Sequence, residues 1–250
     1  MGELILKTRA DSPALKKAAS ALEQAAWGQF GFLNYTKAHY AHYEALLDEY
    51  ADYQQCLIDT DTGYPIAVAN CVPMVCTDEE IDNLPSEGWD WVVERSAASR
   101  GQTPNTLGGL AISVPNIHRG RGVGRVMIKA MHDLSKRKGF KAFLAPVRPS
   151  AKANHPFVSI DDYVEWKDAS GKFYDPWLRS HAAAGGQFVK PCLNSMVVEE
   201  PIAFWETWTQ QHFNETGEYA VEGALSPVEI DAKAKIGRYA EPNVWFVYRN

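Results

Sequence analysis

The clearest periodic pattern of the chain lies in residues 123–138. Apolar side chains recur there at i, i+3, i+4, i+7, i+8 and i+11, which places them along one stripe of an α-helix. The stripe consists of Val123, Val126, Met127, Ala130, Met131 and Leu134. Gly139 is expected to end the helix. Continuous apolar runs at 107–114 and 140–147 predict strands buried on both faces, so strand, glycine-rich turn, helix and strand form a βαβ unit.

The remaining segments predict further strands and helices on both sides of this unit. Residues 4–8 predict a strand, and Ser12-Pro13 begins a helix that runs to about residue 27. This helix is followed by a second helix at 38–53 and by a hairpin at 56–75, whose turn has the sequence DTDTG. Later predicted helices lie at 89–99, in YVEWKD, in DPWLRSHAAA and at 202–212, and later strands lie in QFVKP, SMVVEE and the terminal EPNVWFVYRN.

Composition narrows the class of protein. The formal net charge of −6 supplies no field to hold a polyanion, so no nucleic-acid partner is expected. No apolar run approaches the ~20 residues of a membrane helix, and the first residues lack the features of a signal peptide. We therefore expect a cytoplasmic protein without a membrane partner. The 4 cysteines form no CxxC pair, so neither a disulfide framework nor a metal site is expected.

The turn before the periodic helix carries the clearest candidate chemistry. Residues 118–128 read HRGRGVGRVMI, with glycines at every second position. Glycines let a ligand approach the backbone, and the free N–H groups of a helix's first turn favour an anion. Arginine side chains add charge-assisted hydrogen bonds, so a diphosphate suits this turn. The predicted anion-binding residues are Arg119, Gly120, Arg121, Gly122, Val123, Gly124 and Arg125.

Two common phosphate-binding motifs do not match this turn. The dinucleotide fingerprint needs G-x-G-x-x-G and an acidic residue after the next strand, and the P-loop needs Gly-Lys-Ser/Thr. The pattern that matches is Arg-x-x-Gly-x-Gly, formed by Arg119, Gly122 and Gly124. After an apolar strand and before an amphipathic helix, it resembles motif A of the GNAT acyltransferase superfamily. The alternative is a glycine-rich turn whose arginines only solvate the surface.

The resemblance implies a fold class. It is an α/β fold with a mixed, mostly antiparallel central sheet flanked by helices, and with a C-terminal extension. Residues 1–250 would form a single acyltransferase domain, with a loop insertion at 148–174 near the acceptor site and an extension at 213–250 that ends in a strand. In such proteins the fourth and fifth strands splay apart, and the backbone of the fourth holds pantetheine. That role corresponds here to Ile112, Ser113 and Val114, although the family's usual proline three residues before the motif arginine is Asn116 in this chain.

The whole chain also resembles a group of bacterial GNAT-like proteins of uncertain substrate. These share a YVxW segment, a DPWLRxH segment and an EPNVW tail, which occur here at 163–166, 175–181 and 241–245. The likeness names no acceptor.

Three residues are candidates for catalysis. Many GNAT enzymes place a carboxylate on the fourth strand, where this chain offers only Ser113. In the family, the acid is usually a tyrosine about four residues before the glycine that ends the fourth helix. The residue at that position here is His181, four residues before Gly185. A histidine can transfer a proton near neutral pH. It is equally suited to a hydrogen bond with a neighbouring carbonyl group, which would order the DPWLR segment. Asp175, which precedes Pro176, is expected chiefly to cap a helix and secondarily to act on the acceptor.

Basic and polar side chains near the predicted acceptor groove are candidates for substrate binding. They are Arg148, Ser150, Lys152 and Arg179. The alternative is a solvated loop for Arg148, Ser150 and Lys152, and a structural ion pair for Arg179. His39 and His42 have a spacing that can bind metal, but no third ligand is evident, so packing or surface exposure is preferred.

These features predict an acyl-CoA-dependent N-acyltransferase. It would move an acyl group, acetyl by preference, from acetyl-CoA or another acyl-CoA directly to an amine of a small molecule, without a metal. Two alternatives stay open, a non-catalytic acyl-CoA-binding protein and an enzyme of the same fold with a carrier-protein thioester as donor. A homodimer is also left open.

Overall fold

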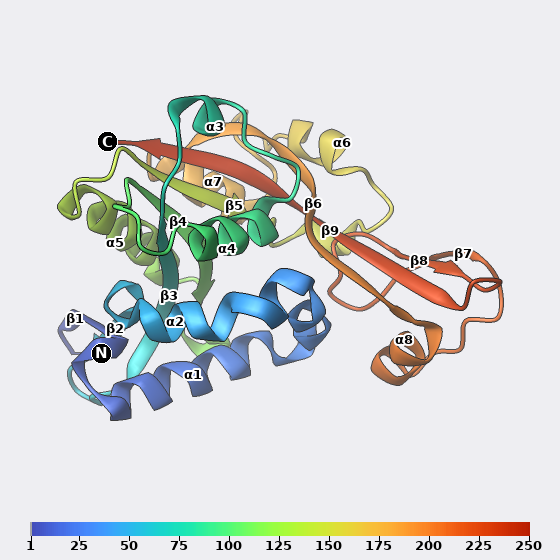
Figure 1. Cartoon of the computed structure of the whole chain (residues 1–250), viewed down its shortest axis with the longest axis horizontal. Coiled ribbons are helices and arrows are strands. Elements are labelled where there is room, and N and C mark those ends of the chain that lie inside the picture. Colours follow the sequence, from blue (N-terminus) through green and yellow to red (C-terminus); the bar gives the residue numbers. More distant parts are fainter. Residues whose placement is uncertain (1) are drawn as a thin grey trace.

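A computed structural model describes residues 2–250, which form one nine-stranded sheet (Figure 1). The strands are β1 (Leu4–Thr8), β2 (Gln55–Asp59), β3 (Pro65–Met74), β4 (Thr106–Ser113), β5 (Ala142–Val147), β6 (Gln187–Pro201), β7 (Gly217–Tyr219), β8 (Val228–Asp231) and β9 (Ile236–Arg249). Their order is β1-β2-β3-β4-β5-β9-β8-β7, and β6 pairs with the other edge of β9. Among these strands only β4 and β5 pair in parallel, which confirms the mixed, mostly antiparallel sheet.

Helices cover both faces of the sheet. They are α1 (Pro13–Trp27), α2 (Glu44–Glu49), α3 (Asp78–Asp82), α4 (Gly88–Ala98), α5 (Val123–Arg137), α6 (Ile160–Glu165), α7 (Pro176–Ala183) and α8 (Ile202–Thr209). We call the face of the sheet that is covered by α1, α2 and α4 the first face, and the face that is covered by α5 and α7 the second face. The apolar stripe of α5 packs on the sheet as predicted, except that Val126 is 44% exposed. No helix within residues 2–250 has both the length and the apolar character needed to cross a bilayer.

Two predicted elements differ from the structure. The helix expected at 38–53 is a π-helical turn, His39–Tyr43, followed by α2 and a 3-10 turn, Ala51–Tyr53. The π turn was not predictable from the sequence, because hydrophobic spacing does not distinguish a π turn from an α turn over five residues. The strands expected in QFVKP and SMVVEE are one strand, β6, because two irregularities in its register let it follow β9 without a break.

The sheet opens between β4 and β5. These strands pair only through Thr106–Gly108 and Ala142–Leu144, and beyond that point β5 continues to pair with β9. The register of β4 on β3 shifts at the same level, where Ala111 is opposite Asn70 but Gly109 is opposite Cys71. Leu110 is therefore the extra residue of a β-bulge. The expected splaying of the fourth and fifth strands is present, and it leads directly into the glycine turn.

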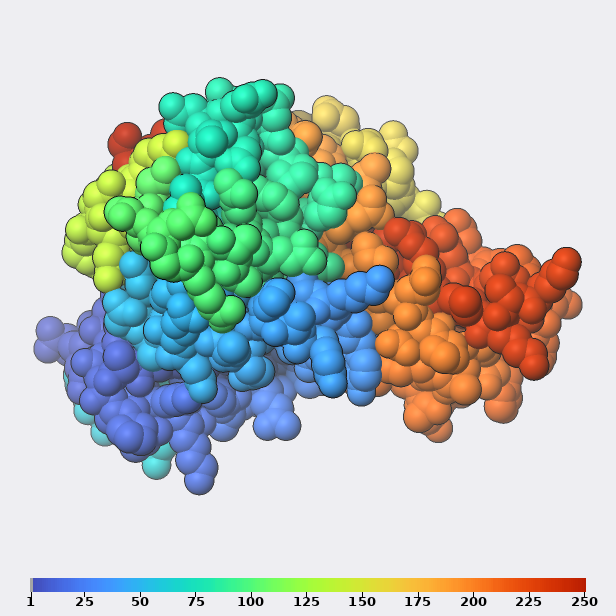
Figure 2. Space-filling model, viewed as in Figure 1, coloured from blue at the N-terminus to red at the C-terminus, as the bar shows by residue number. Residues whose placement is uncertain are grey.

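The C-terminal part of the chain projects beyond the main sheet. The long strands β6 and β9 carry α8, β7 and β8 at their far ends (Figure 1). In the space-filling view this part forms a lobe that touches the segment after α1 (Figure 2). Trp208 of α8 lies against Gly31, and Trp205 is fully buried. The division of residues 1–250 into one domain, an insertion at 148–174 and an extension at 213–250 stays a prediction.

Candidate functional site

Two glycines of the turn have a backbone conformation that other residues rarely adopt. Gly120 and Gly122 have φ values of +74° and +78°, in the left-handed region, and Gly122 caps α5. Arg125 N–H and Val126 N–H donate to Gly122 O, whereas the amides from Gly120 to Gly124 find no acceptor within the described residues 2–250. The turn is exposed rather than filled by its own side chains. Its free amides are therefore available to an anion.

The arginines of the turn are placed differently from one another. Arg119 Nε donates to Val114 O at 3.0 Å, which ties the turn to the end of β4. Arg121 and Arg125 are exposed, and the described part of the chain gives their guanidinium groups no hydrogen-bond or ion-pair partner. These two side chains can therefore turn towards a bound phosphate at little cost.

Gly124 has a role that the sequence did not reveal. A Cβ atom at this position would lie 2.7 Å from the indole of Trp177 on α7. Glycine is needed here because the indole packs against the first turn of α5. Trp177, which follows the capping Asp175 on α7, therefore forms one side of the turn.

The end of β4 lies along the opening of the sheet. Ile112 and Ser113 pair with β3 on one edge, and their other edge faces the gap left by β5. Backbone groups on that edge are free to bind an extended ligand. Ser113 is buried and its Oγ accepts a hydrogen bond from Trp27 Nε1 at 2.8 Å. This contact favours a positioning role for Ser113 over a catalytic one, and the sequence did not single out Trp27.

His181 occupies a setting that argues against proton donation near neutral pH. It is 4% exposed, and its Nδ1 lies 2.8 Å from the Tyr248 hydroxyl, which donates in turn to His181 O. Burial lowers the pKa of His181 to about 3. These contacts favour the ordering role that the sequence also allowed, and the acid role stays a prediction.

Asp175 is a helix cap. Its Oδ1 accepts from Trp177 N and Leu178 N, and its Oδ2 accepts from Ala151 N and Tyr163 OH. The carboxylate is 1% exposed, so four donors occupy a group that solvent hardly reaches. The capping role preferred from the sequence fits this geometry, and an acceptor-binding role does not.

The predicted substrate-binding cations mostly have internal partners. Arg148 Nε pairs with Glu241 at 2.9 Å, and its Nη2 donates to Gly223 O. Lys152 Nζ donates to His155 O and Leu225 O, and burial lowers its pKa to about 8. Arg179 Nη1 donates to Phe173 O and Tyr174 O. These contacts favour structural roles, whereas Ser150 is exposed.

An open hollow of about 710 Å³ lies elsewhere, between α8 and the segment after α1. It is lined by Tyr35, Ala203, Phe204, Thr207 and Trp208. None of these belongs to the glycine turn or to β4, so the size of this hollow does not locate the chemistry.

Known proteins share this architecture. No family model matches the chain. The arginine N-acetyltransferase avaD of Aspergillus versicolor is 32% identical over 225 residues, covering 80% of this chain and 77% of its own length. The loading GNAT-like domain of CurA from Lyngbya majuscula aligns at a TM-score of 0.62 with 13% identity, over 99% of this chain and 98% of that one. The GNAT-like decarboxylase GphF, solved with isobutyryl-CoA, aligns at 0.57 with 13% identity over the same shares.

These structures define the class by fold alone, because their sequences have diverged so far. The avaD relative goes further, since a third of its aligned residues are shared over most of both chains. The chain belongs to the GNAT N-acetyltransferase superfamily. The narrower bacterial group with its three shared segments stays a prediction.

Proposed function

We propose that the protein transfers an acetyl group from acetyl-CoA to the amine of a small molecule. The observation that carries this proposal is the row of unpartnered amides from Gly120 to Gly124, directly beside the opening between β4 and β5. A diphosphate at the turn places the rest of a coenzyme A molecule within reach of the opening. Membership of the acyltransferase superfamily supports the same conclusion.

On this proposal, different residues bind different parts of acetyl-CoA. Arg121 and Arg125 add positive charge around the diphosphate, and Trp177 shields one side of it. The free backbone edge of Ile112 and Ser113, together with the Val114 amide, holds the pantetheine arm, which leaves the thioester in the opening. The Val114 carbonyl is held by Arg119. The acceptor nitrogen then attacks the thioester carbon, the C–N bond forms, the C–S bond breaks, and the nitrogen loses a proton.

The acceptor approaches, on this proposal, from the first face. Two carboxylates lie there, Glu23 of α1 and Asp90 of α4. Asp90 accepts from Thr36 Oγ1 and Val197 N, and it has no cationic partner in the part of the chain that the structure describes. Burial raises its pKa to about 7, so a nearby cation would favour its charged form. Glu23 already pairs with Arg9, so Asp90 is the group that suits a basic acceptor. Arginine, the substrate in the avaD name, is the first compound to test.

Turnover measurements test this function. Thiol release from acetyl-CoA should require an amine, and arginine should support faster release than a neutral amino acid that presents only its α-amine. Tight acetyl-CoA binding with no turnover over a broad amine panel would instead identify a binding protein. Turnover of acyl-pantetheine on a carrier protein, with none of acetyl-CoA, would identify the carrier-dependent enzyme.

A further inference from the structure

Three aromatic rings pack together on the first face. The imidazole of His39 packs against the ring of Tyr43, at 4.6 Å and 24°, and against the indole of Trp89, at 5.9 Å and 17°. The rings of Tyr43 and Trp89 also contact each other, at 5.4 Å, so each ring touches the other two. His39 and Tyr43 are the first and last residues of the π-helical turn. Single π turns inside helical segments occur frequently at functional sites. We call Tyr43, His39 and Trp89 the ring stack.

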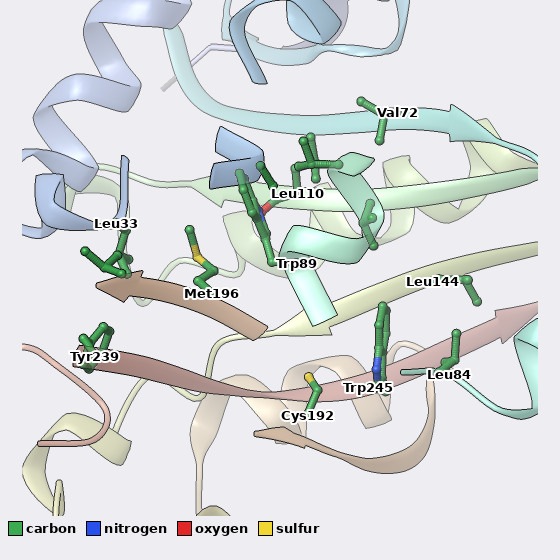
Figure 3. Close-up of a cluster of buried hydrophobic side chains, with 14 of the residues drawn as sticks. Leu33, Val72, Leu84, Trp89, Leu110, Leu144, Cys192, Met196, Tyr239 and Trp245 are labelled. Atoms are coloured by element: carbon green, nitrogen blue, oxygen red, sulfur yellow. The ribbon is translucent and has the colours of Figure 1, made fainter. Parts of the chain in front are cut away.

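Tyr43 and Trp89 are fixed to the strands at the level where the sheet opens. Trp89 Nε1 donates to the carbonyl of Leu110, the extra residue of the β4 bulge, at 2.8 Å. Asn70 Nδ2, opposite the bulge on β3, donates to Tyr43 OH at 3.0 Å. Figure 3 shows Trp89 beside Leu110, with Met196 of β6 next to them. The ring stack is therefore held in place independently of His39.

The nitrogens of His39 are free. Neither ring nitrogen has a hydrogen-bond partner within the described residues 2–250, and neither is among the fully buried unpaired atoms of the structure. The imidazole is half-buried, and its backbone N–H is held by Thr36 Oγ1. Burial lowers its pKa to about 4, which keeps the ring neutral. The ring is therefore held in place while its two nitrogens stay open to a ligand or to water.

We propose that His39 accepts the proton that the acceptor amine loses during acyl transfer. The inference rests on the proposed function and adds a catalytic residue to it. The amine nitrogen bonds to the thioester carbon, the positively charged nitrogen passes one proton to the imidazole, and coenzyme A departs as a thiolate. The imidazolium then returns its proton to water, and the thiolate takes one up, so charge and atoms balance. On this proposal the proton passes from the amine nitrogen to the imidazole directly or through one water molecule.

Other groups near the opening are less suited to this step. The Ser113 hydroxyl is held by Trp27, and His181 is buried on the second face against Tyr248. Glu23 is engaged by Arg9 and Asn70. His42 lies on the same turn as His39 but outside the ring stack.

Substitutions that keep the ring stack separate catalysis from packing. His39→Phe retains a stacking ring and removes both nitrogens, and His39→Ala leaves space for added imidazole. Acceptor-dependent thiol release and acetyl-CoA binding are measured for both, with His42→Phe as the matched control. We expect kcat of His39→Phe to fall at least about 100-fold with acetyl-CoA affinity within about twofold of the wild type. Imidazole should restore part of the activity of His39→Ala, and His42→Phe should remain active.

The outcomes distinguish this inference from the proposed function. A wild-type protein without acceptor-dependent thiol release overturns both. An active wild type with an equally active His39→Phe variant overturns only the role of His39. A folded His39→Ala variant that imidazole does not restore assigns the ring to packing and overturns the proposal in the same way.

Discussion

Single residues in this protein are constrained for different physical reasons. Gly122 is required by its left-handed backbone, whereas Gly124 is required by the indole that lies against it. Both occur in one short motif and look alike in the sequence. Asp175 and His181 likewise share one helix, yet the carboxylate is saturated with donors and the imidazole is held neutral.

Removal of the Asp175 carboxylate should destabilise the fold without touching the chemistry directly. Asp175→Ala leaves four donors without their acceptor, including two amides at the start of α7. We expect a loss of about 3 kcal/mol in the free energy of unfolding, measured by urea denaturation. The cap of α1 is a control, since Ser12→Ala removes one bond to Leu15 N and should cost about 1 kcal/mol. Equal costs for the two variants would contradict this account.

The buried imidazole of His181 predicts a pH dependence of stability. Its folded pKa of about 3 lies below the ordinary value of 6.5, so the unfolded chain binds the proton more readily. The stability that this group contributes is therefore complete above pH 6.5 and is lost as pH falls towards 3. Between pH 6.5 and pH 5 the wild type should lose about 2 kcal/mol more than His181→Asn. Parallel stability curves for the two proteins would exclude this assignment.

At the scale of elements, the ends of distant segments meet around one ion pair. Arg148 follows β5, Glu241 lies on β9, and the guanidinium also covers the ring of Phe30 after α1 at 4.7 Å. Glu241 is 1% exposed and its second oxygen accepts from Tyr239 OH. The pair joins the segments that border the opening of the sheet.

Replacing one partner of this ion pair should lower the free energy of unfolding more than expected from the replacement of both partners together. Arg148→Met leaves a buried carboxylate without its cation, and we expect a loss of about 3 kcal/mol. The double variant Arg148→Met/Glu241→Met should lose less than the sum of the two single variants, because neither charge remains unpaired. Unfolding in urea measures all four proteins, and strictly additive losses would show that the two groups act independently.

Elements with strong patterns could be predicted from the sequence, and those set by tertiary contacts could not. The stripe of α5 and the apolar runs of β4 and β5 gave the βαβ unit, because burial imposes a period on each. The π turn at His39–Tyr43 and the bulge at Leu110 leave no such period. The glycine turn was predictable as an anion site, but its wall, Trp177, depends on how α7 packs on α5. Both Arg148 and Lys152 have a carbonyl partner more than 70 positions away, Gly223 and Leu225, and local patterns do not predict such contacts.

At the scale of the whole molecule, the C-terminal lobe is attached to the segment after α1. Gly31 makes this possible, since a Cβ atom there would lie 2.7 Å from Trp208 of α8. Phe32 also contacts the rings of Trp205 and Trp208. The segment after α1 and the C-terminal lobe thus lie side by side (Figure 2).

A side-chain atom at position 31 should weaken the packing of the C-terminal lobe against the segment after α1. Gly31→Ala forces Trp208 outwards, so we expect a loss of about 1 kcal/mol and a changed tryptophan emission spectrum. Gly28→Ala is the matched control, because a Cβ at Gly28 meets nothing within 4 Å and the substitution should be neutral or slightly stabilising. Identical behaviour of the two variants would show that the contact with Trp208 carries no constraint.

The central claim is that the first turn of α5 holds the diphosphate of acetyl-CoA. Calorimetric titration of acetyl-CoA into the wild type, Arg125→Ala and Lys129→Ala tests it most directly, because both variants remove one positive charge from the same helix. Arg125 lies in the first turn, and Lys129 lies one turn further on, paired with Asp133. Binding should weaken about tenfold in Arg125→Ala and less than about twofold in Lys129→Ala. Equal affinities for all three proteins, or no binding to the wild type, would contradict the account.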